Sequence, residues 1–345
     1  MSEQHHRGPG TGQAPPAPTA PGPGRPSGTG RAHGKAILLG EHAVVYGAPA
    51  VAVPLPALSC VVTVGFPTGS DGGTGRNRRT ALAVPTGRTV PAEAGVMAPG
   101  LCRLTDALCQ DHRLDVPAVD VTLENDIPHG MGLGSSAACA RALTHALDQL
   151  LRLNLTAAEI FHYIQISENS AHGRASGIDA LATGSTRPVL LADGHTSTPP
   201  VGTRAWIVVA DSGSSGRTRQ AVGMLRTFFD EHPLRRERFL ARSASLTHQA
   251  LRALDRGRLD ALGRHLIDSH ALLAALRLST DRVDALVDTA LAHGALGAKM
   301  TGGGLGGCVI ALTDTAAAAA TLAARLVGNG VARTWTTSIE PGRPV

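Results

Sequence analysis

The sequence predicts an α+β protein with two domains. Segments with strand-like and helix-like patterns mix along the chain without the regular strand–helix repeat of a doubly wound sheet. The 345 residues exceed the usual length of one domain, and 43% of them are hydrophobic, so the chain can bury a sizeable core. This apolar content excludes a wholly disordered protein.

The first 30 residues are predicted to form a disordered tail. They contain seven glycines and seven prolines, and Met1 is their one large apolar residue. Such a segment buries too little apolar surface to offset the entropy lost on ordering. Ordered structure is therefore expected from about Arg31.

The first half of the ordered chain is predicted to mix strands and helices. The capping box from Thr156 to Glu159 starts one of the helices, and alternating apolar residues mark the strand at 119–123. A polar, glycine-rich stretch at 71–79 is expected to be a loop or hairpin tip. The predicted strands are 36–39, 50–64 and 119–123, and the predicted helices are 101–113, 157–171 and one that ends near Leu151.

The second half is predicted to be mostly helical. It begins with a buried strand at 206–210 and contains a strand that ends at Leu312 and a terminal strand near 331–338. The predicted helices are 217–231, 233–256, 258–276, 281–293 and 315–327.

Composition excludes several classes of protein. The net charge of +5 comes without a dense basic run, and aromatic residues are only 3%, so nucleic-acid binding is not expected. No apolar run is long enough to span a membrane. The five cysteines lack C-x-x-C spacing, which indicates reduced thiols and a cytoplasmic protein rather than a zinc site or a disulfide framework. Lys35 and Lys299 are the two lysines among 32 basic residues, and each adjoins a motif-like segment.

A glycine-rich segment stands between a predicted strand and a predicted helix. Gly130, Gly132 and Gly134 let the backbone approach a ligand closely, and Ser135 and Ser136 follow at the start of the helix. The free N–H groups and positive end of the helix dipole would face this loop, which predicts a phosphate site. The alternative is an ordinary glycine turn with a serine cap.

Two acidic residues follow in the next helix and just after it. Glu168 lies four residues after Ile164, on the apolar stripe, and in the last turn, where the helix dipole disfavours an anion. It therefore needs a cation, for which Mg²⁺ and a buried arginine are the alternatives. Asp179 follows a turn that contains two glycines. It is either a functional carboxylate or a helix cap.

Two further segments carry candidate residues. Lys35 stands at the mouth of an apolar strand, and Glu41 and His42 follow the glycine turn at its far end. Their alternatives are a surface lysine and a solvated loop. Five of the seven residues at 301–307 are glycine, which indicates close backbone approach to a ligand or a bulged connection.

In combination, these segments resemble the GHMP kinases, and within them the mevalonate kinases of bacterial type. The resemblance covers about residues 31–338 and rests on three motifs, at 34–47, 127–138 and 299–308. The segment at 172–179 also resembles the part of the mevalonate kinases that carries the catalytic aspartate. It implies the two-domain GHMP kinase fold, with an N-terminal ribosomal-protein-S5-like domain at 31–200 and a C-terminal ferredoxin-like domain at 201–345.

The resemblance also implies an activity, the ATP-dependent phosphorylation of (R)-mevalonate to (R)-5-phosphomevalonate in isoprenoid biosynthesis. Asp179 would take the proton from the C5 hydroxyl, and Lys35 would pair with Asp179. Ser136 and Glu168 would hold Mg²⁺. The ATP phosphates would bind at Gly130, Gly132, Leu133, Gly134, Ser135 and Ser136. The mevalonate pocket would include Glu41, His42, Thr301, Gly302 and Gly303.

ATP and mevalonate are thus the expected small-molecule partners. A homodimer is expected because members of the family often dimerise, and neither nucleic acid nor a membrane is expected as a partner. The alternatives are another GHMP small-molecule kinase, acting on phosphomevalonate or homoserine, and a non-catalytic ligand sensor with the same fold.

Overall fold

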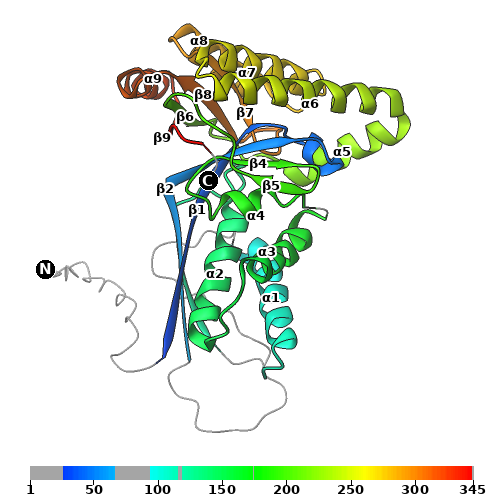
Figure 1. Cartoon of the computed structure of the whole chain (residues 1–345), viewed down its shortest axis with the longest axis vertical. Coiled ribbons are helices and arrows are strands. Elements are labelled where there is room, and N and C mark those ends of the chain that lie inside the picture. The colour runs from blue at the N-terminus through cyan, green and yellow to red at the C-terminus, as the bar shows by residue number, and fades with distance from the viewer. Residues whose placement is uncertain (1–25, 67–93, 116–118, 174, 344–345) are drawn as a thin grey trace, which may run out of the picture.

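A computed structural model describes residues 26–66, 94–115, 119–173 and 175–343 (Figure 1). Within them lie two antiparallel sheets and the helices that cover them, which confirms the α+β class. The segment at 71–79 and most of the expected tail lie outside the described residues. None of the helices in the described ranges is long and apolar enough to cross a membrane.

The first sheet is built around one long strand. β2 pairs with β1 along its length, with β3 through its second half and with β4 through its first three residues. The hairpin partner β5 extends the sheet beyond β4. The strands are β1 (Ser27–Leu39), β2 (Ala50–Gly65), β3 (Asp120–Asn125), β4 (Val189–Ala192) and β5 (His195–Ser197).

Strand β1 starts four residues before the expected start of order at Arg31, so residues 27–30 correct that expectation. The glycines that suggested disorder are needed for packing against helix α2 (Ser135–Leu151). A Cβ at Gly28 would lie 2.0 Å from the carbonyl oxygen of Ala146, and one at Gly30 would lie 1.9 Å from that of Ala142. The strand and helix backbones therefore touch directly at these glycines.

Helix α2 packs against β1 and β2, and helices α1 and α3 pack beside it (Figure 1). The Thr156 capping box starts α3 as predicted, because its hydroxyl accepts from Glu159 N while the Glu159 carboxylate accepts from Thr156 N. The remaining helical segments here are α1 (Ala94–Asp111), η1 (Ala43–Tyr46), α3 (Ala157–His172) and α4 (Ile178–Ala182).

The second sheet has the strand order β7-β8-β6-β9, and helices cover it at the top of Figure 1. Its strands are β6 (Ala205–Asp211), β7 (Gly297–Thr301), β8 (Cys308–Thr313) and β9 (Thr334–Ile339). Its helices are α5 (Thr218–Glu231), α6 (Pro233–Asp255), α7 (Leu259–Ala274), α8 (Asp281–Ala292) and α9 (Ala316–Gly328).

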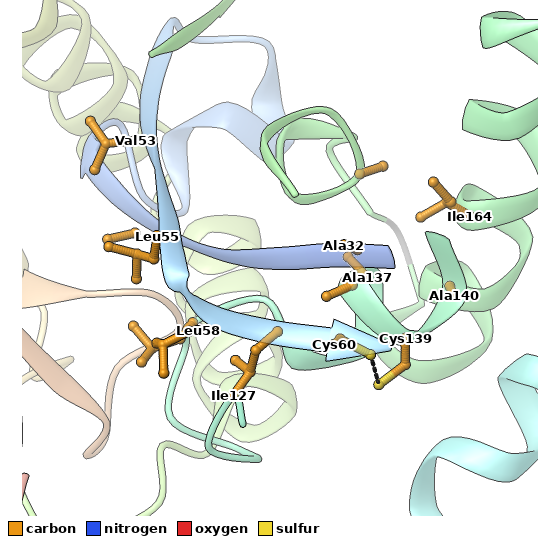
Figure 2. Close-up of a cluster of buried hydrophobic side chains, with 14 of the residues drawn as sticks. Ala32, Val53, Leu55, Leu58, Cys60, Ile127, Ala137, Cys139, Ala140 and Ile164 are labelled. Carbon is orange, nitrogen blue, oxygen red and sulfur yellow. Dashed lines mark hydrogen bonds between the residues drawn. The ribbon is translucent and has the colours of Figure 1, made fainter. Parts of the chain in front are cut away.

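One hydrophobic cluster spans both sheets. The largest cluster of buried side chains combines Leu55 and Leu58 from the first sheet with Ile207 and Ile310 from the second. Figure 2 shows the part of this cluster around β2 and α2, where the sulfur atoms of Cys60 and Cys139 lie 3.5 Å apart. All five cysteines are free thiols, as the sequence predicts.

Candidate active site

The glycine-rich segment forms a tight loop that ends on the N-terminus of α2. Gly130, Gly132 and Gly134 all have positive φ angles, between 70° and 79°, a region that L side chains rarely adopt. Gly134 is the N-cap of α2, so the free N–H groups of the first turn lie next to the loop. The loop can therefore hold an anion such as a phosphate, as its sequence predicts.

Lys35 reaches this loop from β1. Its ammonium lies 2.9 Å from the Asp179 carboxylate and donates a hydrogen bond of 3.1 Å to the carbonyl of Gly132. The Lys35 side chain is 2% exposed, which excludes a surface lysine, whereas that of Asp179 is 33% exposed. The Asp179 carboxylate is thus partly accessible, while its counter-ion, the Lys35 ammonium, is buried.

Glu168, near the end of α3, is buried beside this pair. Burial, and then the nearby Asp179 carboxylate, raise the pKa of Glu168 to about 7, although a hydrogen bond from Ser136 and the charge of Lys35 oppose the shift. A buried carboxylate of this kind gains most from a bound cation.

The residues around Glu168 fit Mg²⁺. The described residues contain no group of three or more His, Cys, Asp or Glu side chains arranged to hold a metal. Mg²⁺ is commonly held by one or two carboxylates together with substrate phosphates, rather than by an all-protein cage. Glu168 and the Ser136 hydroxyl, next to the phosphate loop, supply oxygen ligands for this mode of binding.

Glu41 and His42 are buried, which excludes the solvated loop. Lys299, from β7, forms a fully buried ion pair with Oε1 of Glu41 and donates a second hydrogen bond of 2.6 Å to the carbonyl of Met300. Glu41 Oε2 and His42 Nε2 have no hydrogen-bond partner within the described part of the chain. Burial lowers the pKa of His42 to about 4, so the imidazole is neutral near pH 7.

Thr301 is buried and is not among the residues that line the cavity, so its expected contact with the substrate stays a prediction. Its hydroxyl donates to the carbonyl of Ile37 at 3.0 Å and accepts from the N–H of Ile37 at 2.9 Å. Thr301 therefore ties β7 to β1, because the end of β7 lies directly beside that strand. Gly302 follows it and contacts the phosphate loop, since a Cβ at Gly302 would lie 2.6 Å from Cα of Gly132.

All the other expected site residues line one cavity of about 890 Å³. The cavity also contains residues that the sequence did not reveal: Arg103, His129, Gln165, Gly216, Arg217 and Arg219. Gln165 Oε1 and His129 Nδ1 are buried without a hydrogen-bond partner among the described residues. The position of Gln165, one helical turn before Glu168, is the one sequence signal that could have identified it.

Comparison with known protein families shows which class of enzyme the chain resembles. Residues 101–186 match the model of the GHMP kinases N terminal domain, and residues 250–332 match that of the GHMP kinases C terminal. The matches fall in the two halves of the chain and include the phosphate loop, Glu168, Asp179 and Lys299.

Individual relatives narrow the assignment. The mevalonate kinases of Thermococcus onnurineus and Pyrococcus horikoshii are both 34% identical to this chain, with 80% of this chain and 86% of theirs covered. The chain belongs to the mevalonate kinase family of the GHMP kinases. A crystal structure of L. major mevalonate kinase in complex with R-mevalonate has the same fold, with a TM-score of 0.75 at 24% identity over 92% of this chain and 98% of that one. The mevalonate kinase structure from Staphylococcus aureus MRSA252 gives a TM-score of 0.63 at 26% identity, over 92% of this chain and 100% of that one.

Proposed function

We propose that this protein transfers the γ-phosphoryl group of ATP to the C5 hydroxyl of (R)-mevalonate, giving (R)-5-phosphomevalonate and ADP. The observation that carries the proposal is the Lys35–Asp179 pair, 2.9 Å apart in the cavity that the phosphate loop also lines. Phosphoryl transfer depends on positioning and on charge neutralisation, and this pair supplies both at the position of the attacking oxygen.

In the reaction, the C5 oxygen forms a bond to the γ-phosphorus while the bond from that phosphorus to the β,γ-bridging oxygen breaks. The hydroxyl proton passes to the accessible carboxylate of Asp179, and the electron pair of the broken bond leaves on ADP. Lys35 favours the negative charge that develops on the attacking oxygen. Because Lys35 is buried, its charge acts with little screening by water.

The phosphates of ATP would bind at the loop from Gly130 to Ser136, through backbone N–H groups and the N-terminus of α2. Ser136 and Glu168 would hold Mg²⁺ there. The bound ion supplies charge neutralisation at the β- and γ-phosphates. Arg217, which also lines the cavity, would add a positive charge there.

The mevalonate pocket would be formed by Glu41, His42, Gly302 and Gly303, which line the same cavity. Glu41 Oε2 is an acceptor for a substrate hydroxyl, because Lys299 occupies the other carboxylate oxygen. The neutral His42 offers Nε2 as a second hydrogen-bonding atom. These orphaned polar atoms favour a small, hydroxylated substrate over an apolar one.

The test is a turnover screen of the purified protein with ATP and Mg²⁺ against (R)-mevalonate, phosphomevalonate and homoserine, followed by coupled detection of ADP. The proposal expects (R)-mevalonate to have the highest kcat/KM. Preference for phosphomevalonate or homoserine would reassign the substrate within the GHMP kinases. Absence of turnover with all three would support a ligand sensor.

We also propose a division of the chain near residue 200, between the last strand of the first sheet and the first strand of the second. We propose further that the protein is a homodimer and is cytoplasmic. Light scattering of the purified protein measures its oligomeric state, and a monomer at micromolar concentration would contradict the homodimer.

A further inference from the structure

Helix α4 carries Asp179 but has little structure of its own to hold it. It spans five residues, and its backbone bonds include those from Leu181 N to Gly177 O and from Thr183 N to Asp179 O. A helix of this length is not stable alone. The position of the Asp179 carboxylate therefore depends on groups outside the helix.

One such group is the guanidinium of Arg141, on helix α2. Its Nη2 donates a hydrogen bond of 2.6 Å to the carbonyl of Ala180, the residue next to Asp179. The last carbonyl groups of a helix lack partners within the helix, so an external donor satisfies one of them. Arg141 thus links the helix that begins at the phosphate loop to the helix that carries Asp179.

Gly184 provides the space in which this guanidinium lies. A Cβ at Gly184 would lie 2.4 Å from Cζ of Arg141, 2.5 Å from Nη1 and 2.6 Å from Nε. Arg141 Nε is buried and has no hydrogen-bond partner among the residues that the structure describes. Burial of a charged group with an unsatisfied donor is costly in free energy, and the short hydrogen bond to α4 offsets part of that cost.

A second set of contacts holds α4 from the side of β1. The Thr183 hydroxyl donates to the carbonyl of Asp179 at 3.0 Å, and the carbonyl of Thr183 accepts from the N–H of His33 at 3.2 Å. His33 stands two residues before Lys35 on the same strand. Lys35 lies on β1, and these contacts fix Asp179 to the same strand. Arg141 adds a contact to α4 from helix α2.

We propose that Arg141, seated against Gly184, is a positioning residue that fixes α4 and thereby sets the distance between Asp179 and Lys35. Arg141 is not among the residues that line the cavity, so it acts through Asp179 and does not touch the substrates. The catalytic part of this inference rests on the proposed mevalonate kinase activity.

The first experiment compares Arg141→Met and Arg141→Lys with the wild-type protein. Arg141→Met is expected to lower kcat by about 10- to 100-fold, because small displacements of reacting groups have effects of this size. KM for ATP and for mevalonate should change by less than about twofold, since no contact with either substrate is lost. Arg141→Lys keeps the charge and one donor, so it should recover part of kcat.

The second experiment moves the guanidinium without removing it. Gly184→Ala is expected to lower kcat, because the added methyl group would collide with Arg141. The double variant Arg141→Met/Gly184→Ala should be no slower than Arg141→Met alone, since the collision is then absent. Gly328→Ala in α9 is the matched control, because its Cβ would meet nothing within 4 Å, and it should leave kcat unchanged.

Hydrogen exchange of a peptide covering α4 separates this inference from the proposed function. Faster exchange in Arg141→Met and Gly184→Ala than in the wild type is expected, whatever substrate the protein uses. Inactivity of the wild type towards mevalonate would refute the proposed function and leave this test intact. Wild-type kcat or wild-type exchange in Gly184→Ala, or additive losses in the double variant, would overturn the role of Arg141. If Arg141→Met fails to fold, Gly184→Ala and Arg141→Lys decide the question.

Discussion

Lys299 and Glu41, 258 residues apart in the sequence, form a buried ion pair between the strand β7 and the turn that follows β1. Lys299 is completely buried, and burial lowers its pKa while Glu41 opposes this shift. The pair therefore joins the two sheets. It leaves the second oxygen of Glu41, a residue that lines the cavity, without a hydrogen-bond partner among the described residues.

We expect Lys299→Met to lower the free energy of unfolding by about 3–5 kcal/mol, because it leaves the Glu41 carboxylate buried without its partner. The double variant Glu41→Gln/Lys299→Met should be more stable than Lys299→Met alone. Urea unfolding measures both. Arg264→Met is the control, since its pair with Asp260 is exposed and should contribute less than about 1 kcal/mol. Equal losses in the single and double variants would contradict the pairing.

Removal of either charge of the Lys35–Asp179 pair should abolish most turnover. Lys35→Met is expected to lower kcat by about 10²–10³-fold, and Asp179→Asn by about 10²–10⁴-fold. Lys35→Met should fold, because the carboxylate that it leaves behind is partly exposed. Asp179→Asn should fold because the buried Lys35 ammonium keeps its hydrogen bond to the Gly132 carbonyl and the nearby charge of Glu168. Arg242→Met, from the exposed pair with Asp268, is the control. Full activity of either site variant in the ADP assay would reject this assignment.

Glu168→Gln is expected to raise the Mg²⁺ concentration needed for half-maximal activity, because an amide binds Mg²⁺ more weakly than a carboxylate. A Mg²⁺ titration at saturating ATP and mevalonate measures the shift. The exposed Glu340→Gln is the matched control. Coincident titration curves for Glu168→Gln and the wild type would count against a metal ligand at this position.

Glu168 should also make stability depend on pH in metal-free buffer. Its pKa is about 7 in the folded protein, above the usual 4.5, so the unfolded chain ionises first as the pH rises. The stability of the folded protein therefore falls between these two values and stays low above pH 7, by on the order of 3 kcal/mol. Glu168→Gln cannot ionise, and should exceed the wild type in Tm at about pH 8.5 but not at about pH 4. Similar differences in Tm at both pH values would contradict the raised pKa.

Gly134→Ala tests the contact between the phosphate loop and Lys35. Gly134 has a φ of 79°, and its Cβ would lie 2.9 Å from Cγ of Lys35. The added methyl group should displace the ammonium and lower kcat by about tenfold or more. Gly194→Ala is the control, because it shares the strained φ, 74°, but meets nothing within 4 Å. Equal kcat values for these two variants would show that the contact with Lys35 has no effect.

Local patterns predicted most of the fold. The apolar periodicity located helices α5 to α9 within a few residues, and the capping box located the start of α3. The short elements η1, α4, β4, β5 and β7 were missed, because a segment of three to five residues has too few positions to show a period. The start of β1 was missed because glycine at positions 28 and 30 carries no apolar signal, although the packing against α2 requires it.

The candidate site was predicted in part, for a different physical reason. The glycine motif and the acidic residues can be identified from their neighbours in the sequence. The pairing of Lys299 with Glu41, and the tie between Thr301 and Ile37, depend on how two distant strands meet, and no spacing encodes that distance. No sequence pattern marks Arg141 or Gln165. Their roles follow from contacts with α4 and the cavity, which appear only in the folded structure.

The hydrophobic cluster that spans both sheets has a consequence for how the molecule comes apart. If either half were expressed without the other, the side chains around Leu55, Leu58, Ile207 and Ile310 would be left facing water. With the proposed division near residue 200, each half would depend on the other to bury its side of this cluster. Heat or denaturant should unfold the protein in a single cooperative step. A chain divided at residue 200 should aggregate.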